Sequence, residues 1–154
     1  MKKTIKLIFL FLIINFGALA LGGFLMQNGP QTDWYKNIHI APWTPPGWVF
    51  GFAWTTIMIC FSFFMAWLYS VGNSRFVIGL YIIQLILNIS WGYFFFNLHW
   101  LGFSFLVIFL LTLVTIAFFM YSYRKLGWKS TFILPYIVWL CIACSLNLYA
   151  ALYN

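Results

Sequence analysis

Residues 101–123 read LGFSFLVIFLLTLVTIAFFMYSY, and residues 131–153 read TFILPYIVWLCIACSLNLYAALY. Neither stretch contains a charged side chain, and each reaches the length of about 20 apolar residues with which an α-helix crosses a bilayer. Only residues 124–130 separate the two stretches, so we expect two antiparallel, neighbouring helices. This pair of stretches predicts an α-helical membrane protein.

Three further stretches of the same kind precede this pair, at roughly residues 5–26, 48–69 and 76–96. Over the whole chain 65% of the residues are hydrophobic and 6% are charged, whereas about a quarter of the residues of a soluble domain are charged. We therefore predict an all-α integral membrane bundle of five transmembrane helices in a single domain, residues 1–154. Its one long connection, residues 27–47, joins the first two helices, and the short connections make the other consecutive helices antiparallel neighbours.

The first stretch also has features of a secretory signal, because lysines precede its apolar run and Ala18-Leu19-Ala20 matches the small-residue pattern of a cleavage site. The apolar run continues to Met26, however, which makes it longer than the apolar core of about 7 to 15 residues in a signal peptide. A retained first helix is therefore our prediction.

The basic residues lie almost entirely on one predicted side of the membrane. The N-terminus and the connections after the second and fourth helices share that side, which holds Lys2, Lys3, Lys6, Arg75, Arg124, Lys125 and Lys129; only Lys36 lies on the other. Positive charge in short loops favours the cytoplasm, so we place the N-terminus there and the long first loop and the C-terminus outside. The net charge of +7 is explained by this topology, and we predict no nucleic-acid partner.

Few residues are available for acid–base or metal chemistry. The chain has one acidic residue, Asp33, and two histidines, His39 and His99, so we predict no catalytic residues, no metal site and no required cofactor. An axial bond from either histidine to a haem iron is the alternative to an ordinary loop position. Cys141 and Cys144 form a C-x-x-C inside the last helix, where we favour a packing role over a redox pair.

Polar side chains within the predicted helices indicate their buried faces, because a polar group that faces lipid is costly. One stripe on the third predicted helix consists of Gln84, Asn88, Trp91 and Phe95, and one on the fifth consists of Pro135, Trp139, Ala143 and Asn147 with Leu146 beside it. The simpler interpretation is that such stripes are helix contacts held by interhelical hydrogen bonds, and for Gln84 and Asn88 alone we favour it.

Small residues spaced four apart let helix backbones approach closely. Two such pairs occur, Ala18 with Gly22 on the first predicted helix and Gly47 with Gly51 on the second. The second helix also places Trp54, Thr55 and Met58 on the side of its glycine pair. We expect close helix packing at both pairs.

Three tryptophans lie deeper than the membrane interface where tryptophan is usual, namely Trp54, Trp91 and Trp139. A rise of 1.5 Å per residue places Trp54 about 9 Å from the outer end of its helix, and Trp91 and Ala143 roughly 20 Å from the inner ends of theirs. All three positions therefore fall in the outer half of the bilayer, beneath the long loop. A site lined by indoles and small residues suits a flat, largely apolar ligand.

Three motifs together resemble a known family. The loop and second helix contain Asp33-Trp34-Tyr35 and residues 42–51, PWTPPGWVFG, followed by Trp54; the third helix contains residues 84–91, QLILNISW, followed by Phe94-Phe95-Phe96; and the fifth contains residues 134–139, LPYIVW, followed by Ala143 and Leu146-Asn147. In order and spacing they are similar to the translocator protein family, also called tryptophan-rich sensory proteins or peripheral-type benzodiazepine receptors. The resemblance covers nearly the whole chain.

The resemblance implies a membrane receptor or sensor that binds porphyrins, including haem-related tetrapyrroles, and similar flat hydrophobic ligands, with a tendency to form homodimers. It places the ligand among the first loop and most of the helices, at Trp34, Tyr35, Trp43, Pro45, Trp54, Gln84, Asn88, Trp91, Phe95, Trp139, Ala143, Leu146 and Asn147. The loop is expected to cover this site as a lid. Alternative functions are light-dependent porphyrin degradation, with Trp54 and Trp139 as oxidisable partners, and transport of tetrapyrroles or lipids.

Three positions depart from the family pattern. Ile40-Ala41 stands where the family usually has Lys-Pro, so an anion contact from that lysine is not expected here. Met58 replaces a frequent tyrosine of the second helix. No basic residue follows Tyr149, so the cholesterol-recognition pattern of the C-terminus is incomplete and cholesterol binding through it is not predicted.

Overall fold

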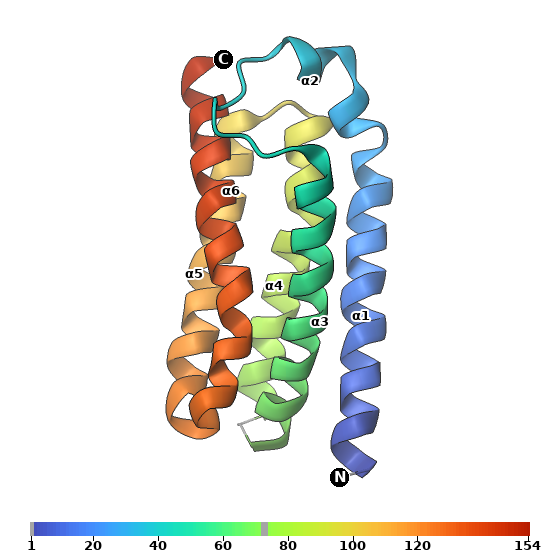
Figure 1. Ribbon diagram of the computed structural model, residues 1–154, viewed down its shortest axis with the longest axis vertical. Helices are drawn as coiled ribbons and strands as arrows, with labels where there is room; N and C mark the ends of the chain where they lie inside the picture. Colours follow the sequence, from blue (N-terminus) through green and yellow to red (C-terminus); the bar gives the residue numbers. More distant parts are fainter. Residues whose placement is uncertain (1, 72–73) are drawn as a thin grey trace.

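The computed structural model describes residues 2–71 and 74–154, and in these ranges the chain is helical with no strand. In chain order the elements are α1 (Lys2–Met26), the 3₁₀ turn η1 (Gly29–Gln31), the short helix α2 (Asp33–Asn37), α3 (Gly47–Val71), α4 (Ser74–Phe96), α5 (Leu101–Leu126), the 3₁₀ segment η2 (Gly127–Ile133) and α6 (Leu134–Tyr153). The five long helices stand side by side (Figure 1). The predicted all-α bundle is confirmed.

The order of the helices around the bundle is α1, α4, α5, α6 and α3, with α3 returning to α1. The consecutive pairs α4–α5 and α5–α6 pack as expected. Helices α3 and α4 differ from this expectation, because they make few direct contacts and α1 packs extensively against both of them. The reason is visible in the side chains: Asn15 of α1 donates to Ser62 of α3 and accepts from Tyr81 of α4.

The last two helices differ from their predicted limits. Helix α5 continues past the expected end at residue 123 to Leu126, where Gly127 stops it with a φ of 55°. The helix expected from residue 131 begins at Leu134, because residues 127–133 form the 3₁₀ segment in which the Ser130 hydroxyl donates to the carbonyl of Gly127. Pro135 lies in the first turn of α6. The N–H groups of a first turn have no acceptor within the helix, so the missing N–H of proline costs no hydrogen bond there.

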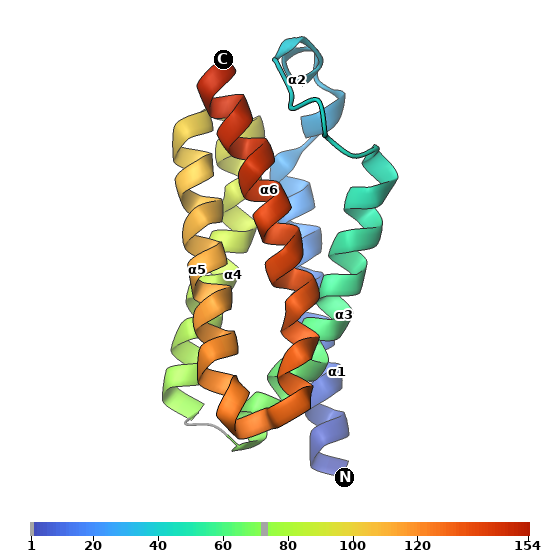
Figure 2. The same cartoon turned by 60° about the vertical axis from the view of Figure 1, so that its left-hand side comes forward.

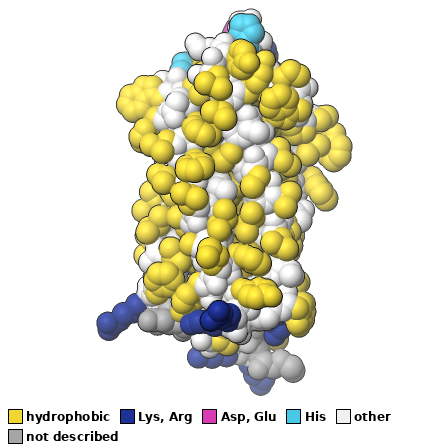
Figure 3. All heavy atoms as spheres, turned by 90° about the vertical axis from the view of Figure 1, so that its left-hand side faces the viewer, with side chains coloured by type: hydrophobic (Ala, Val, Ile, Leu, Met, Phe, Trp, Pro, Cys, Tyr) yellow, Lys and Arg dark blue, Asp and Glu magenta, His cyan; other side chains and the backbone are white. Residues whose placement is uncertain are grey.

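The bundle has two chemically different ends. Figure 3 shows lysine and arginine side chains gathered at one end, histidine at the other, and hydrophobic side chains over the surface between them. We call the end with Lys2 and η2 the basic end, and the end with residues 27–46 and the C-terminus the loop end. The apolar surface between the two ends is what a bilayer requires.

Four helical stretches in the described residues are long and apolar enough to cross a membrane, and the fourth, Leu101–Tyr153, has 53 residues. A straight helix of that length would measure about 80 Å, against about 30 Å for the bilayer core. The chain instead turns back at η2, so that α5 and α6 lie antiparallel (Figure 2). These four stretches therefore provide the five crossings.

The two predicted close approaches of small residues had different outcomes. A Cβ on Gly22 would lie 3.8 Å from the Cα of Ile89, so α1 and α4 do approach closely there. Around Gly47 and Gly51 nothing lies within 4 Å of such an atom. The prediction of close packing at this pair was wrong, because no neighbouring helix approaches either glycine.

Candidate functional site

A cavity lies at the loop end, between residues 35–44 of the long connection and helices α3, α4, α5 and α6. Its lining consists of Tyr35, Ile40, Ala41, Thr44, Phe50, Trp54, Trp91, Phe95, Phe96, Ile108, Trp139, Ala143, Leu146, Asn147 and Ala150. The enclosed volume is about 50 Å³. A cavity that holds a benzene molecule measures about 150 Å³, so in this conformation the site is closed around very little free space.

One wall of the cavity is a hydrogen bond between α4 and α6. The indole N–H of Trp91 donates to Oδ1 of Asn147 over 3.0 Å, and the Asn147 amide donates to the carbonyl of Ala143 one turn earlier. Asn147 is 4% exposed, so this pairing satisfies a polar group that would otherwise be costly to bury. The bond also holds the Trp91 ring in the lining.

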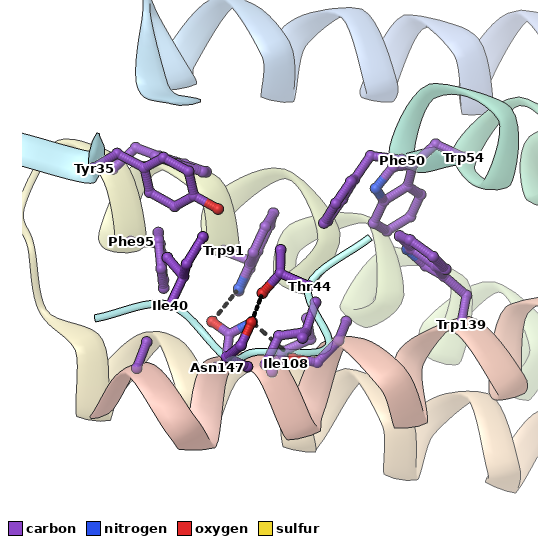
Figure 4. Close-up of a pocket in the computed structure, with 15 residues that line it drawn as sticks. Tyr35, Ile40, Thr44, Phe50, Trp54, Trp91, Phe95, Ile108, Trp139 and Asn147 are labelled. Carbon is purple, nitrogen blue, oxygen red and sulfur yellow. Dashed lines mark hydrogen bonds between the residues drawn. The ribbon is translucent and has the colours of Figure 1, made fainter. Parts of the chain in front are cut away.

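Aromatic rings of α3 and α6 form the opposite end of the cavity. Figure 4 shows Phe50, Trp54 and Trp139 together, on the side away from Tyr35 and Phe95. The rings of Phe50 and Trp139 meet edge to face with centroids 5.2 Å apart, and Trp54 meets the buried ring of Tyr136 at 6.0 Å. Edge-to-face contacts of this kind are favourable between aromatic rings.

The loop supplies the roof. Thr32 caps α2 by accepting from the N–H of Tyr35, and the Tyr35 ring packs on Phe95 and Phe96. Burial raises the pKa of the Tyr35 phenol above its ordinary value. Tyr35 is thus held in the roof as a neutral group, and it is the one titratable side chain among the lining residues.

Further contacts fasten the loop to α6. The indole N–H of Trp43 donates to the Ser145 hydroxyl over 3.1 Å, and its ring meets Tyr149 edge to face. The side chain of Asn154 bonds both the N–H and the carbonyl of His39, at 2.8 and 3.0 Å. The roof is therefore docked on the C-terminal helix.

The structure brings together most of the residues predicted for the site. Those that line the cavity are Tyr35, Trp54, Trp91, Phe95, Trp139, Ala143, Leu146 and Asn147; those that do not are Trp34, Trp43, Pro45, Gln84 and Asn88. The Trp34 ring stacks on His99 with centroids 3.8 Å apart. Trp43 is 55% exposed and donates to Ser145 of α6, outside the lining.

Gln84 and Asn88 form a helix contact. Both side-chain amides donate to the Tyr136 hydroxyl, each over 2.8 Å. These two hydrogen bonds join α4 to α6, as the simpler interpretation expected for Gln84 and Asn88 alone, whereas Trp91 and Phe95 of the same stripe line the cavity. Asn88 also borders a second space of about 90 Å³ between α1, α3 and α4, and Trp54 and Trp91 line both this space and the first.

Several lining residues were missed from the sequence, among them Phe50, Phe96, Ile108, Thr44 and Ala150. An apolar residue in a membrane helix has the same appearance whether it faces lipid or a cavity, so Ile108 gave no signal. For Phe50 and Ala150 the sequence did contain a signal. Phe50 lies four residues before Trp54, and Ala150 lies three residues after Asn147, so each shares a helix face with a predicted lining residue. Tyr136, the acceptor of both amides, likewise precedes Trp139 by three.

The cavity offers stacking surface and one amide, with little for acid–base chemistry. Neither His39 nor His99 is part of the lining. Within residues 2–71 and 74–154 no three His, Cys, Asp or Glu side chains gather as a metal site would require. Cys141 and Cys144 are free thiols, and Cys144 lies 3.3 Å from the Thr112 hydroxyl of α5.

Comparisons with known proteins agree with the resemblance of the motifs. The model of the TspO/MBR family matches residues 9–152. A tryptophan-rich sensory protein of Cereibacter sphaeroides is 27% identical over 147 residues, covering 96% of this chain and 91% of that protein. Protein CrtK of Rhodobacter capsulatus is 33% identical over 87% of this chain and 86% of its own length. The translocator protein of Bos taurus is 32% identical over 83% and 80%. This chain is an integral membrane protein that belongs to the TspO/MBR family.

Proposed function

We propose that the chain is a membrane receptor or sensor that binds porphyrins and similar flat hydrophobic ligands in the loop-end cavity. Membership of a family of sensory and translocator proteins supports a membrane receptor role. The observation that carries the ligand class is the lining itself: three indoles and three phenylalanine rings surround one space, with no ionic side chain among them. Rings of this kind bind a planar π-system by stacking and by edge contacts.

Binding requires the cavity to widen. A tetrapyrrole is several times larger than benzene, and the enclosed space is about 50 Å³, so roof, helices or rings must move apart when the ligand enters. The aromatic contacts that close the site in the free protein are then exchanged for contacts with the ligand. Such a site releases its ligand slowly, because the protein closes around it.

Equilibrium titration with protoporphyrin IX in nanodiscs, in the dark, tests the proposal. We expect saturable quenching of tryptophan fluorescence, and weaker binding by Trp54→Ala, whose ring lines the cavity. Trp48→Ala is the matched control, because that indole is 73% exposed outside the lining. Binding that does not saturate, or that both variants weaken equally, would refute the proposed site.

The alternative functions give different outcomes in the same preparation. Trp54 and Trp139 stand together in the lining (Figure 4), which favours light-dependent porphyrin degradation as the second candidate. Under illumination that activity would consume the porphyrin with new absorption bands, whereas a receptor would return it unchanged. Transport would be seen as movement of porphyrin across a sealed liposome. We also propose that the N-terminus is cytoplasmic, which cysteine labelling tests, and that the chain forms homodimers, which mass measurement in nanodiscs tests.

A further inference from the structure

We infer that the ligand enters the cavity from within the membrane, through the seam between the loop-end half of α3 and the first half of α6, and that Phe50 and Trp139 form the gate. This inference rests on the proposed ligand site. It concerns the route into that site, which neither the lining nor the family assignment specifies.

The first observation is the pattern of interhelical hydrogen bonds. In the described part of the chain, side-chain bonds join α1 to α3, α1 to α4, α4 to α6 and α5 to α6. None of these bonds joins α3 to α6 or α4 to α5, but α4 and α5 pack extensively whereas α3 and α6 make the fewest contacts of any neighbouring pair in the ring. Within a bilayer, packing and interhelical hydrogen bonds hold helices together, so the α3–α6 seam has the weakest support.

The second observation is the course of the two helices. They come together near the basic end, where α3 also packs on η2, and they diverge toward the loop end (Figures 1 and 2). An apolar groove of about 310 Å³ runs along the seam on the outside of the bundle, bordered by Val49, Ala53, Val138 and Ile142 among others. A groove at this position opens to the lipid chains.

The third observation is how thin the wall is between groove and cavity. Trp139 borders both spaces, and its ring meets Phe50 of the cavity lining edge to face at 5.2 Å. Rotation of these two side chains, with a small outward movement of α3, would join the groove to the cavity. A Cβ built on Gly47 or Gly51 would have nothing within 4 Å, so there is space beside these two positions of α3.

The roof is a less suitable entrance. It is fastened to α6 by the Trp43–Ser145 bond and the paired bonds between His39 and Asn154. A flat apolar ligand also concentrates in the bilayer rather than in water, since burial of apolar surface is favourable. The seam lets such a ligand enter without crossing the aqueous side of the loop.

The test is to lock each route separately. Both proteins are built on a cysteine-free background with Cys60→Ala, Cys141→Ala and Cys144→Ala. The first carries a cysteine pair across the seam, Ala53→Cys with Val138→Cys. The second carries a pair across the roof, His39→Cys with Asn154→Cys. Each pair is joined by a short bis-methanethiosulfonate linker, which a reductant removes. Stopped-flow mixing with protoporphyrin IX in nanodiscs, in the dark, then gives association rates before and after reduction.

We expect the seam lock to slow association by about tenfold or more, reversibly, and the roof lock to leave it within about twofold. Equal rates with the seam locked and reduced would overturn the inference, as would a roof lock that slows entry as much as the seam lock. These outcomes presuppose that the reduced proteins bind. Reduced proteins that bind no porphyrin would refute the proposed function itself.

A second variant tests the gate without a crosslink. Phe50→Ala should raise the association and release rates together by severalfold, because it removes one of the two gate rings. Phe109→Ala is the control, since Phe109 is an exposed ring of α5 outside both the cavity and the groove. Rates in Phe50→Ala that match those in Phe109→Ala would also overturn the inference.

Discussion

The half of the bundle nearer the basic end and the half nearer the loop end use the same five helices but pack them differently. Near the basic end Phe61, Phe64 and Phe118 have no exposed surface, and their rings lie within about 6 Å of one another. Near the loop end Trp54 and Trp91 remain partly exposed around a cavity. Both halves contain many aromatic side chains, so the aromatic content does not determine which half is closely packed and which half can accept a ligand.

Helix α3 contains this difference within a single element. In its basic-end half Ser62 receives a hydrogen bond from Asn15 and donates one to the carbonyl of Met58. In its loop-end half, a Cβ placed on Gly47 or Gly51 would have no atom within 4 Å. Residue size and hydrogen bonding at the helix seams therefore determine where the bundle can open.

Phe61→Ala should give the largest loss of unfolding free energy, since it leaves a cavity where the phenylalanine ring is fully buried. Phe61 meets Phe64, Tyr81, Phe118 and Tyr136, and truncation of a buried phenylalanine costs about 3 kcal/mol or more of unfolding free energy. The matched change at the loop end, Phe50→Ala, should cost about 1 kcal/mol because its surroundings are open. Unfolding by dodecyl sulfate in mixed micelles measures both, and equal losses would contradict the comparison.

Ala143→Phe should act on ligand affinity while the protein still folds. Ala143 is 6% exposed and lines the cavity, so a ring at this position fills the space that the ligand needs. Overpacking costs about 1 to 3 kcal/mol, and a loss of 1.4 kcal/mol weakens binding about tenfold. Porphyrin titration measures the change, with Ala20→Phe, on an exposed face of α1, as control. Unaltered affinity would remove Ala143 from the site.

Asn15→Ala and Asn147→Ala compare the buried amides of the two halves. Each should cost about 0.6 to 1.7 kcal/mol of unfolding free energy, the range of interhelical hydrogen bonds in membranes. Only Asn147→Ala should also weaken porphyrin binding, because it releases the Trp91 ring. If Asn15→Ala weakened binding as much, the two halves would be coupled more tightly than their packing indicates.

Trp43→Ala should have a small effect, on the rate of ligand release. It removes the bond to Ser145 and the contact with Tyr149, but the bonds between His39 and Asn154 still hold the roof. We expect release to speed up by about twofold to threefold, since changes of affinity among related variants lie mainly in the dissociation rate. Stopped-flow release measures it. An effect larger than that of Phe50→Ala would identify the roof as the main barrier.

No effect is expected from pH between about 6 and 9 on the affinity for protoporphyrin dimethyl ester, whose carboxyl groups are blocked. Tyr35 is the one titratable residue of the lining, and burial raises its pKa above the ordinary tyrosine value of about 10. Its phenol is therefore neutral below pH 10, and ionisation weakens the roof only above that. An affinity that changes in this window would require a charged group at the site, contrary to the lining described.

Length and apolar composition were sufficient to predict the five helices, and helical periodicity was sufficient to place Trp91, Ala143 and Asn147 on the buried faces of their helices. Composition and periodicity are local properties of a segment. The position of α1 between α3 and α4 was not predictable in this way, because hydropathy identifies where a helix lies but not which helices it touches. The bond that decides it joins Asn15 to Tyr81, 66 residues apart.

The cavity lining was predictable where a residue type was unusual and not where it was common. Deep tryptophans and a buried asparagine are costly or rare in lipid, so they marked the site. Ile108 and Phe50 differ in no local property from residues that face the bilayer. Gly51 misled the prediction because a small residue permits a close helix contact without requiring one.

The position of α1 also has a consequence for biogenesis. This helix is synthesised first, yet Asn15 finds its partner Tyr81 only after another 66 residues have been made. At about 5 to 20 residues per second, the wait is roughly 3 to 13 s. Until Ser62 and Tyr81 have both been made, the inserted α1 carries an incompletely paired amide among lipids or beside the translocation machinery. Cells that slow translation of α3 and α4 should therefore accumulate more of the chain in a protease-sensitive form, and Asn15→Leu, which removes the amide, should lessen that sensitivity to elongation speed.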